Sequence, residues 1–266
     1  MAYEKDREDL IEGRNAVIEA LRSGRGIDKI YLARGEAEAA DKTLGHIASR
    51  ARDAGVVVVR TDRRKLDAMS ATHAHQGVIA VAAVKEYCTL DTLFDLAEGK
   101  GEAPFLILCD EISDPRNFGA ILRTAECVGA HGVIIPKRRS AGITGVVEKT
   151  SAGAAEHVAV ARVANLSAAI RELKERGVWI YGTAASGAHS LWQTDLSGPL
   201  CLVIGSEGEG MGRLVRENCD FLVSIPMRGR LDSLNAATAA GVLMYEVLRQ
   251  RMASGGGAEK ISAEGR

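Results

Sequence analysis

Short apolar segments alternate with amphipathic ones along most of this chain, and this alternation restricts its fold more than any other feature. The runs GVIAVAAV, FLILC, GVIIP and LCLVIG are apolar throughout, which is typical of strands inside a covered sheet. Between such runs apolar residues recur at helical spacing, as in Phe118, Ile121, Leu122 and Ala125. Strands and helices that alternate at this length predict an α/β protein with a largely parallel sheet.

The chain is expected to form two domains of unequal size. Residues 10–84 predict a small α/β domain, and residues 104–252 predict a larger one. Residues 85–103 end in Gly-Lys-Gly-Glu-Ala-Pro and predict a linker. The tail, residues 253–266, is rich in glycine and charge and predicts disorder.

Composition excludes several classes of protein and favours a soluble cytoplasmic one. No apolar run is long enough to cross a bilayer, and the N-terminus lacks the apolar stretch of a signal peptide. The five cysteines are widely spaced, which predicts buried free thiols and no metal site. The formal net charge of -1 does not indicate a nucleic-acid partner, so RNA binding would need local basic clusters. The candidate clusters are Arg22, Arg25 and Lys29; Arg60, Arg63, Arg64 and Lys65; and Lys137, Arg138 and Arg139.

A glycine-rich loop follows an apolar strand and reads Gly-Ser-Glu-Gly-Glu-Gly-Met-Gly from Gly205 to Gly212. Glycines at this density let backbone groups approach a ligand closely, although a tight turn alone would also use them. A P-loop would need Gly-Lys-Ser/Thr after the glycines, which Met211-Gly-Arg213 does not supply. A dinucleotide-binding loop of an oxidoreductase would follow the first strand of its domain, whereas here only one strand and one helix remain. The ligand site is therefore expected among the C-terminal loops.

Two further segments place polar residues after strands. In the first, residues 110–125, Asn117 opens or caps a helix and Arg123 follows about two turns later. In the second, residues 225–236, a strand stops at Pro226 and Ser233 is expected to cap the last helix. Ligands in open α/β sheets bind beyond the carboxyl ends of strands, so both segments are candidate site loops.

Taken together, the three segments resemble the motifs of the SpoU branch of the SPOUT RNA methyltransferases. The first motif is DPRNFGAILRTA (114–125), the second GSEGEG (205–210) and the third IPMRGRLDSLN (225–235). The N-terminal segments GRNAVIEAL (13–21) and HQGVIA (75–80) resemble the RNA-binding domain of the same family. The combination is similar to that of bacterial 23S ribosomal RNA guanosine-2′-O-methyltransferases.

The resemblance implies a parallel α/β sheet with its C-terminus threaded into a deep trefoil knot, preceded by a small RNA-binding domain. The methyl donor, S-adenosylmethionine, would lie bent in the knot. Residues of the second and third motifs and their surroundings would hold it: Gly205, Ile225 and Leu234, with Thr183, Met227 and Ser233 nearby. No metal is implied. Members of the family are homodimers that share active-site residues, and apolar Leu243, Val247 and Leu248 on the last helix are expected to serve such an interface.

The implied reaction is transfer of a methyl group to a ribose 2′-hydroxyl, with 23S ribosomal RNA and guanosine as the expected target. Arg123 would contact the ribose or its phosphate and stabilise developing negative charge, and Asn117 would orient Arg123 or the ribose. Glu207 would fix the motif loops or pair with an arginine, and Ser233 and Asn235 would lie near the reacting hydroxyl. The alternatives are methylation of transfer RNA or of another ribosomal site, and an RNA-binding protein that has kept the fold without the activity.

Overall fold

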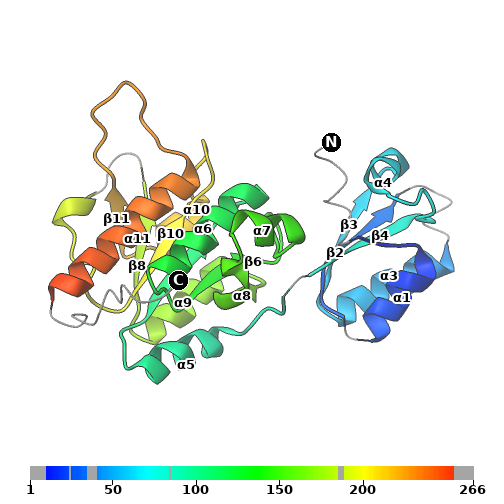
Figure 1. The fold of residues 1–266 in the computed structure, drawn as a ribbon, viewed down its shortest axis with the longest axis horizontal. Coiled ribbons are helices and arrows are strands. Elements are labelled where there is room, and N and C mark those ends of the chain that lie inside the picture. Colours follow the sequence, from blue (N-terminus) through cyan, green and yellow to red (C-terminus); the bar gives the residue numbers. More distant parts are fainter. Residues whose placement is uncertain (1–9, 24, 35–40, 84, 185–188, 255–266) are drawn as a thin grey trace, which may run out of the picture. The chain divides into compact units, whose positions relative to one another are not determined.

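A computed structural model of the chain describes residues 10–23, 25–34, 41–83, 85–184 and 189–254 (Figure 1). It divides into two compact units, an N-terminal unit of residues 1–86 with 141–156, and a C-terminal unit of residues 87–140 with 157–266. Most of the tail for which disorder was expected, residues 255–266, lies outside the described residues.

The N-terminal unit is built around a four-stranded sheet in the order β1-β4-β2-β3. Its elements are β1 (Leu10–Glu12), α1 (Arg14–Arg22), β2 (Ile27–Ala33), α3 (Lys42–Asp53), β3 (Val57–Thr61), α4 (Arg63–Met69) and β4 (Val78–Ala82), with α7 (Gly145–Thr150) and most of α8 (Ala154–His157) grouped with them. α1 and α3 pack on one face of the sheet, and α4 lies against residues of the other.

The expectation of a largely parallel sheet is wrong for this unit. Only β2 and β3 pair in parallel, whereas β4 runs antiparallel to both β1 and β2. The apolar run of β4 shows that the strand is buried, but it carries no information about strand direction. β3 is half-buried rather than buried, because it forms an edge of the sheet.

The two N-terminal segments that resemble the RNA-binding domain lie side by side. The Gly13 amide donates to the Val78 carbonyl at 3.2 Å, and the Arg14 amide donates to Gln76 Oε1 at 3.3 Å. Asp62 caps α4 by accepting a hydrogen bond from the Lys65 amide.

The C-terminal unit contains a seven-stranded sheet in the order β7-β6-β5-β10-β8-β11-β9, and all of its paired strands are parallel. Its strands are β5 (Phe105–Cys109), β6 (Gly132–Pro136), β7 (Val160–Val163), β8 (Trp179–Thr183), β9 (His189–Ser190), β10 (Leu200–Ile204) and β11 (Phe221–Ser224). Its helices are α5 (Leu90–Lys100), α6 (Pro115–Cys127), α9 (Leu166–Glu175), α10 (Arg213–Asn218) and α11 (Ala236–Ala253), with a short 3-10 turn η2 (Leu191–Gln193). The sequence predicted this fold class, an α/β unit with a parallel sheet that follows a smaller α/β unit along the chain.

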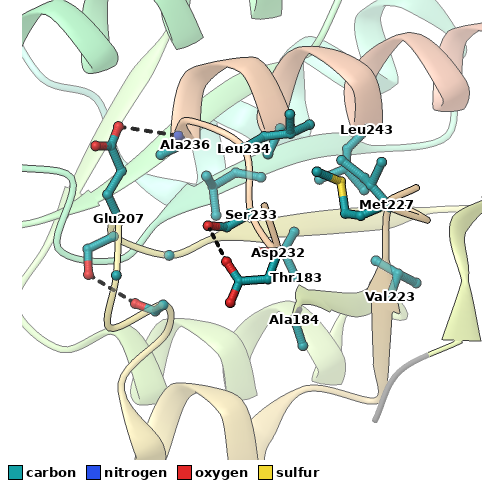
Figure 2. A pocket seen from close by; sticks show the side chains of 17 residues that line it. Thr183, Ala184, Glu207, Val223, Met227, Asp232, Ser233, Leu234, Ala236 and Leu243 are labelled. Carbon is teal, nitrogen blue, oxygen red and sulfur yellow. Dashed lines mark hydrogen bonds between the residues drawn. The ribbon is translucent and has the colours of Figure 1, made fainter. Parts of the chain in front are cut away.

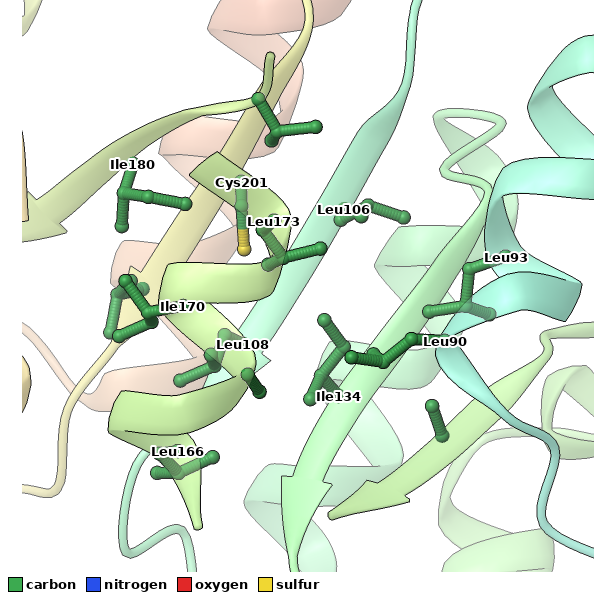
Figure 3. Close-up of a cluster of buried hydrophobic side chains, with 14 of the residues drawn as sticks. Leu90, Leu93, Leu106, Leu108, Ile134, Leu166, Ile170, Leu173, Ile180 and Cys201 are labelled. Carbon is green, nitrogen blue, oxygen red and sulfur yellow. The ribbon is translucent and has the colours of Figure 1, made fainter. Parts of the chain in front are cut away.

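Helices cover both faces of this sheet. α5, α9 and α10 pack on the face that presents Leu106 and Leu108, in the cluster shown in Figure 3. Side chains alternate along a strand, so Phe105 points to the other face. There Arg251 of α11 lies over its ring, 5.2 Å from the centroid, and α11 packs against α6.

Residues 85–103 do not form the expected linker. Leu90 and Leu93 of α5 lie in the core of the C-terminal unit, because an amphipathic helix needs a surface on which to bury its apolar side. The expectation of buried thiols holds for Cys109 and Cys201, and burial raises the pKa of Cys109 to about 12. Cys88 and Cys219 are only partly buried, and Cys127 is exposed.

Candidate functional site

A cavity of about 390 Å³ opens beyond the carboxyl ends of β8, β10 and β11 (Figure 2). The glycine-rich loop that follows β10 and the loop that joins β11 to α11 form much of its wall. The lining residues are Thr183, Ala184, Ile204, Gly205, Ser206, Glu207, Gly208, Gly210, Val223, Ile225, Met227, Asp232, Ser233, Leu234, Ala236, Ala239 and Leu243.

Every residue that the resemblance carried over as a contact of the methyl donor lines this cavity. These residues come from three loops: Thr183 from the end of β8, Gly205 from the end of β10, and Ile225, Met227, Ser233 and Leu234 from the third motif. The sequence did not single out Asp232, Ala184 or Ala239, which also line the cavity, and it assigned Leu243 to an interface rather than to this wall.

The glycine-rich loop folds tightly back on itself. The Ser206 amide donates to the Gly210 carbonyl at 2.9 Å, and the Gly210 amide donates to the Ser206 carbonyl at 3.0 Å. A Cβ atom at Gly205 would lie 2.3 Å from the Gly210 carbonyl carbon and 2.4 Å from the Met211 nitrogen. Glycine is therefore required at 205 by the loop's own backbone, whereas the sequence suggested a requirement for close approach of a ligand.

Asp110, which the sequence analysis left without a role, anchors the far end of this loop. Its carboxylate accepts a hydrogen bond from the Gly212 amide at 2.7 Å, and its own amide donates to the Ile204 carbonyl. Burial raises the pKa of Asp110, although the bond from Gly212 acts in the opposite direction. The end of β5 is thereby tied to both sides of the glycine-rich loop.

One hydrogen-bond network joins all three motifs through the carboxylate of Glu207. Glu207 Oε1 accepts from Asn117 Nδ2 at 2.8 Å and from Asn235 Nδ2 at 2.5 Å, and the Ala236 amide lies 3.4 Å away. Asn235 Nδ2 also donates to Asn117 Oδ1 at 3.0 Å. Because a carboxylate accepts strongly from several donors, Glu207 fixes the relative positions of the motif loops.

The helix caps differ from those that the sequence suggested. Asp114 caps α6 through the Arg116 amide, which leaves Asn117 free to bond Glu207 and Asn235 rather than Arg123. Asn235, not Ser233, caps α11 by accepting from the Ala237 and Thr238 amides. The Ser233 hydroxyl instead donates to Asp232 at 3.2 Å in the wall of the cavity.

Arg123 stands apart from the other candidates. Its side chain is exposed on α6 and it does not line the cavity. Arg123 follows Asn117 by six positions, which corresponds to a rotation of about 240° around an α-helix. The two side chains therefore lie on different faces of α6. The structure therefore brings Asn117, Glu207 and Asn235 together and leaves Arg123 on the surface of the same chain.

The apolar residues expected to serve an interface are largely used within the chain. Leu243 and Val247 are buried on the inner side of α11, and Leu248 is half-buried. Tyr245 of the same helix is 53% exposed.

Within the described residues, no group of three or more His, Cys, Asp or Glu side chains is arranged to hold a metal ion. None of the helices in that part of the chain combines the length and the apolar character needed to cross a membrane.

Sequence comparisons match both units to families. A model described as the SpoU rRNA Methylase family matches residues 104–245, and one described as RNA 2′-O ribose methyltransferase substrate binding matches residues 10–88. A Bacillus subtilis protein named putative TrmH family tRNA/rRNA methyltransferase YacO is 49% identical over 91% of this chain and 96% of its own length. The 23S rRNA (guanosine-2′-O-)-methyltransferase RlmB of Ralstonia nicotianae is 46% identical over 91% of this chain and 96% of its own.

Solved structures with the same fold are also found. An AdoMet-bound rRNA methyltransferase from Sinorhizobium meliloti aligns with a TM-score of 0.56 and 25% identity over 92% of this chain and 88% of that one. The SpoU methyltransferase AviRb of Streptomyces viridochromogenes aligns with a TM-score of 0.58 and 24% identity over 95% of both chains. These structures share the fold, and the family model over residues 104–245 together with relatives that are 46% and 49% identical shows that the chain belongs to the SpoU rRNA methylase family.

Proposed function

We propose that this protein transfers a methyl group from S-adenosylmethionine to the ribose 2′-hydroxyl of a guanosine in 23S ribosomal RNA. Family membership supports an RNA methyltransferase that uses this donor. The Ralstonia relative named for the 23S guanosine reaction, 46% identical, supports the finer target. The observation that carries the proposal is the network of Asn117, Glu207 and Asn235, which joins all three motifs beside one cavity.

The cavity fits the proposed donor. Its volume of about 390 Å³ lies in the range of small-molecule sites. Leu234, Leu243 and Val223 offer apolar surface for an adenine ring, while the backbone of the second and third motifs offers polar groups. The Asp232 carboxylate in the wall suits a ligand that carries a positive charge.

When bound, S-adenosylmethionine supplies a methyl group that its sulfonium already activates. The protein must then hold the 2′-oxygen in line with that group and exclude other orientations. Glu207 and Asn235 fix the loops beside which the ribose would lie. The network thus contributes by positioning rather than by accepting the proton.

Arg123 is proposed to act on the RNA side of the reaction. A guanidinium holds its proton too tightly to serve as a general base near neutral pH. Contact with the ribose or its phosphate would stabilise negative charge as it develops on the 2′-oxygen. A phosphate oxygen or water would take the proton.

We also propose a homodimer with a shared active site. Arg123 is exposed and lies outside the cavity of its own chain, so a second copy could supply it. Mixing Arg123→Ala protein with Glu207→Ala protein after mild dissociation tests this directly. Recovery of activity from two inactive variants supports shared sites, whereas a mixture as inactive as its components contradicts them.

The proposed target is tested by mapping ribose methylation in total RNA from cells with and without this protein. Loss of a single 2′-O-methylguanosine in 23S ribosomal RNA, restored by the wild-type gene but not by Arg123→Ala, is the expected result. Several relatives are named tRNA/rRNA methyltransferases, which makes transfer RNA the second candidate. Loss of a methyl group from transfer RNA alone would overturn the 23S assignment.

A further inference from the structure

The loop between β11 and α11 has a tip that the donor cavity does not use. Its two ends line the cavity, through Ile225 and Met227 on one side and residues 232–234 on the other. The intervening residues 228–231, Arg-Gly-Arg-Leu, are all exposed and do not line it. Figure 1 shows this segment standing out beyond the sheet between the end of β11 and the start of α11. We call residues 228–231 the loop tip.

The loop tip exposes apolar surface that the described residues of its own chain do not cover. Leu231 is 77% exposed, the largest exposed fraction among the exposed large apolar side chains in the described part of the chain. An isolated exposed leucine is ordinary on a protein surface. Here, however, it lies between Arg230 and Asp232, and Asp232 is part of the cavity wall.

The loop tip also concentrates positive charge at the rim. Arg228 and Arg230 have exposed side chains, and neither forms a salt bridge within the described residues. The acidic groups nearby are engaged elsewhere: Glu207 accepts from the motif asparagines, and Asp232 accepts from Ser233. Arginine side chains bind the phosphates of single-stranded RNA and also stack on its unstacked bases. The exposed side chain of Leu231 beside them offers apolar surface that a base could contact.

We infer that the loop tip binds the RNA strand that flanks the methylated nucleotide. Arg228 and Arg230 contact the adjoining backbone phosphates, and Leu231 packs against a base displaced from its stack. The reacting ribose must enter the cavity, so its neighbours must pass the rim from which the tip projects. This inference rests on the proposed function and adds a determinant of RNA selection at the same site.

The test compares Arg228→Ala/Arg230→Ala with a matched pair, Arg171→Ala/Arg216→Ala. The control removes the same charge from exposed positions on α9 and α10, which cover the sheet face opposite α11. Donor binding is measured by calorimetry. RNA affinity and methyl transfer are measured with 23S ribosomal RNA and transfer RNA as separate probes over a range of salt concentrations. The tip pair should lower the slope of log affinity against log salt by about 1.4, or about 0.7 per phosphate contact on a single strand, and weaken RNA binding at least about tenfold.

Two further variants separate the contributions. Arg228→Lys/Arg230→Lys keeps the charges, so it should recover most of the salt slope if phosphates are the partners. Leu231→Ser should weaken RNA binding several-fold without changing the slope. All tip variants should bind S-adenosylmethionine within about twofold of wild type, because the tip does not line the cavity.

Unchanged RNA affinity and slope in the tip pair would overturn the inference, as would an equal loss in the control pair. Loss of donor affinity in the folded tip pair would assign the loop to the donor instead. If the wild-type protein methylates only transfer RNA, the 23S target is wrong, and the inference about the loop tip is then tested by the affinity and salt slope of the tip variants for transfer RNA. If it binds neither RNA, both proposals fail.

Discussion

Replacing Glu207 by Ala should loosen the donor cavity without unfolding the protein. The change removes the acceptor for Asn117 Nδ2 at 2.8 Å and Asn235 Nδ2 at 2.5 Å. Hydrogen bonds to a charged group stabilise by about 1.5–3 kcal/mol each. These side chains are exposed, so we take about 1 to 1.5 kcal/mol each, or about 2 to 3 kcal/mol for the two bonds. That energy corresponds to a change of roughly 30- to 150-fold in the population of the assembled loops.

Donor affinity should follow that population, because the apparent dissociation constant rises as the binding-competent fraction falls. We expect at least about tenfold weaker binding of S-adenosylmethionine to Glu207→Ala in calorimetric titration. A loss of about 2 to 3 kcal/mol would lower the thermal midpoint by roughly 4–12 °C at most, so the variant should stay folded at the temperature of the titration. Glu209→Ala is the matched control, since Glu209 is an exposed glutamate of the same loop with no side-chain bond among those described. Adding Asn117→Ala to Glu207→Ala should cost less than Asn117→Ala does in the wild type, because the bond between Asn117 and Glu207 is already lost and only the bond from Asn235 to Asn117 remains. Wild-type affinity in folded Glu207→Ala would refute the argument.

Three other changes probe separate parts of the molecule. Gly205→Ala should weaken donor binding at least about tenfold in the same titration, because a Cβ atom would meet the loop backbone at 2.3 Å; Gly99→Ala, which meets nothing within 4 Å, should leave it unchanged. Arg123→Ala should keep donor affinity and lower single-turnover methyl transfer at least about 100-fold; near-normal turnover would remove this arginine from the mechanism. Glu12→Gln should destabilise residues 10–82 in hydrogen exchange at pH 7 by roughly 1 to 2 kcal/mol. Burial acts to raise the pKa of Glu12, but hydrogen bonds from Ser70, Thr72 and two amides outweigh it and lower the pKa to about 2. The stability that the Glu12 carboxylate contributes is therefore present above pH 4.5 and lost toward pH 2. If Glu12→Gln is still as much less stable than the wild type at pH 2, the carboxylate is not the origin of the difference.

Local sequence signals predicted much of what the structure contains. The apolar runs gave the buried strands β5, β6 and β10, because a strand covered on both faces has no polar side. The position of the glycine-rich loop near the end of its domain placed the cavity among the C-terminal loops. Each of these inferences depends on neighbours in sequence.

What the sequence could not predict depends on contacts between distant residues. The antiparallel direction of β4 is set by its pairing with β1 and β2. Gly205 is required because Gly210 and Met211 fold back onto it. Asparagine is a common helix cap, but Asp114 caps this helix instead, which leaves the side-chain amide of Asn117 to donate to Glu207. Asp110 lies about 100 residues from its partner Gly212, so no spacing rule could have joined them.

The arrangement of the C-terminal unit separates the groups that would hold the donor from those that would meet RNA. Donor candidates line a cavity whose loops are fixed by Glu207 and by the bond from Gly212 to Asp110. Arg123 and the loop tip are exposed and lie outside that cavity. A rigid cavity needs internal hydrogen bonds that hold its loops in place. Phosphate binding instead needs exposed positive side chains that are not already paired with acidic groups of the protein. Changes in one group should therefore alter donor affinity and changes in the other RNA affinity, with methyl transfer the only property that depends on both.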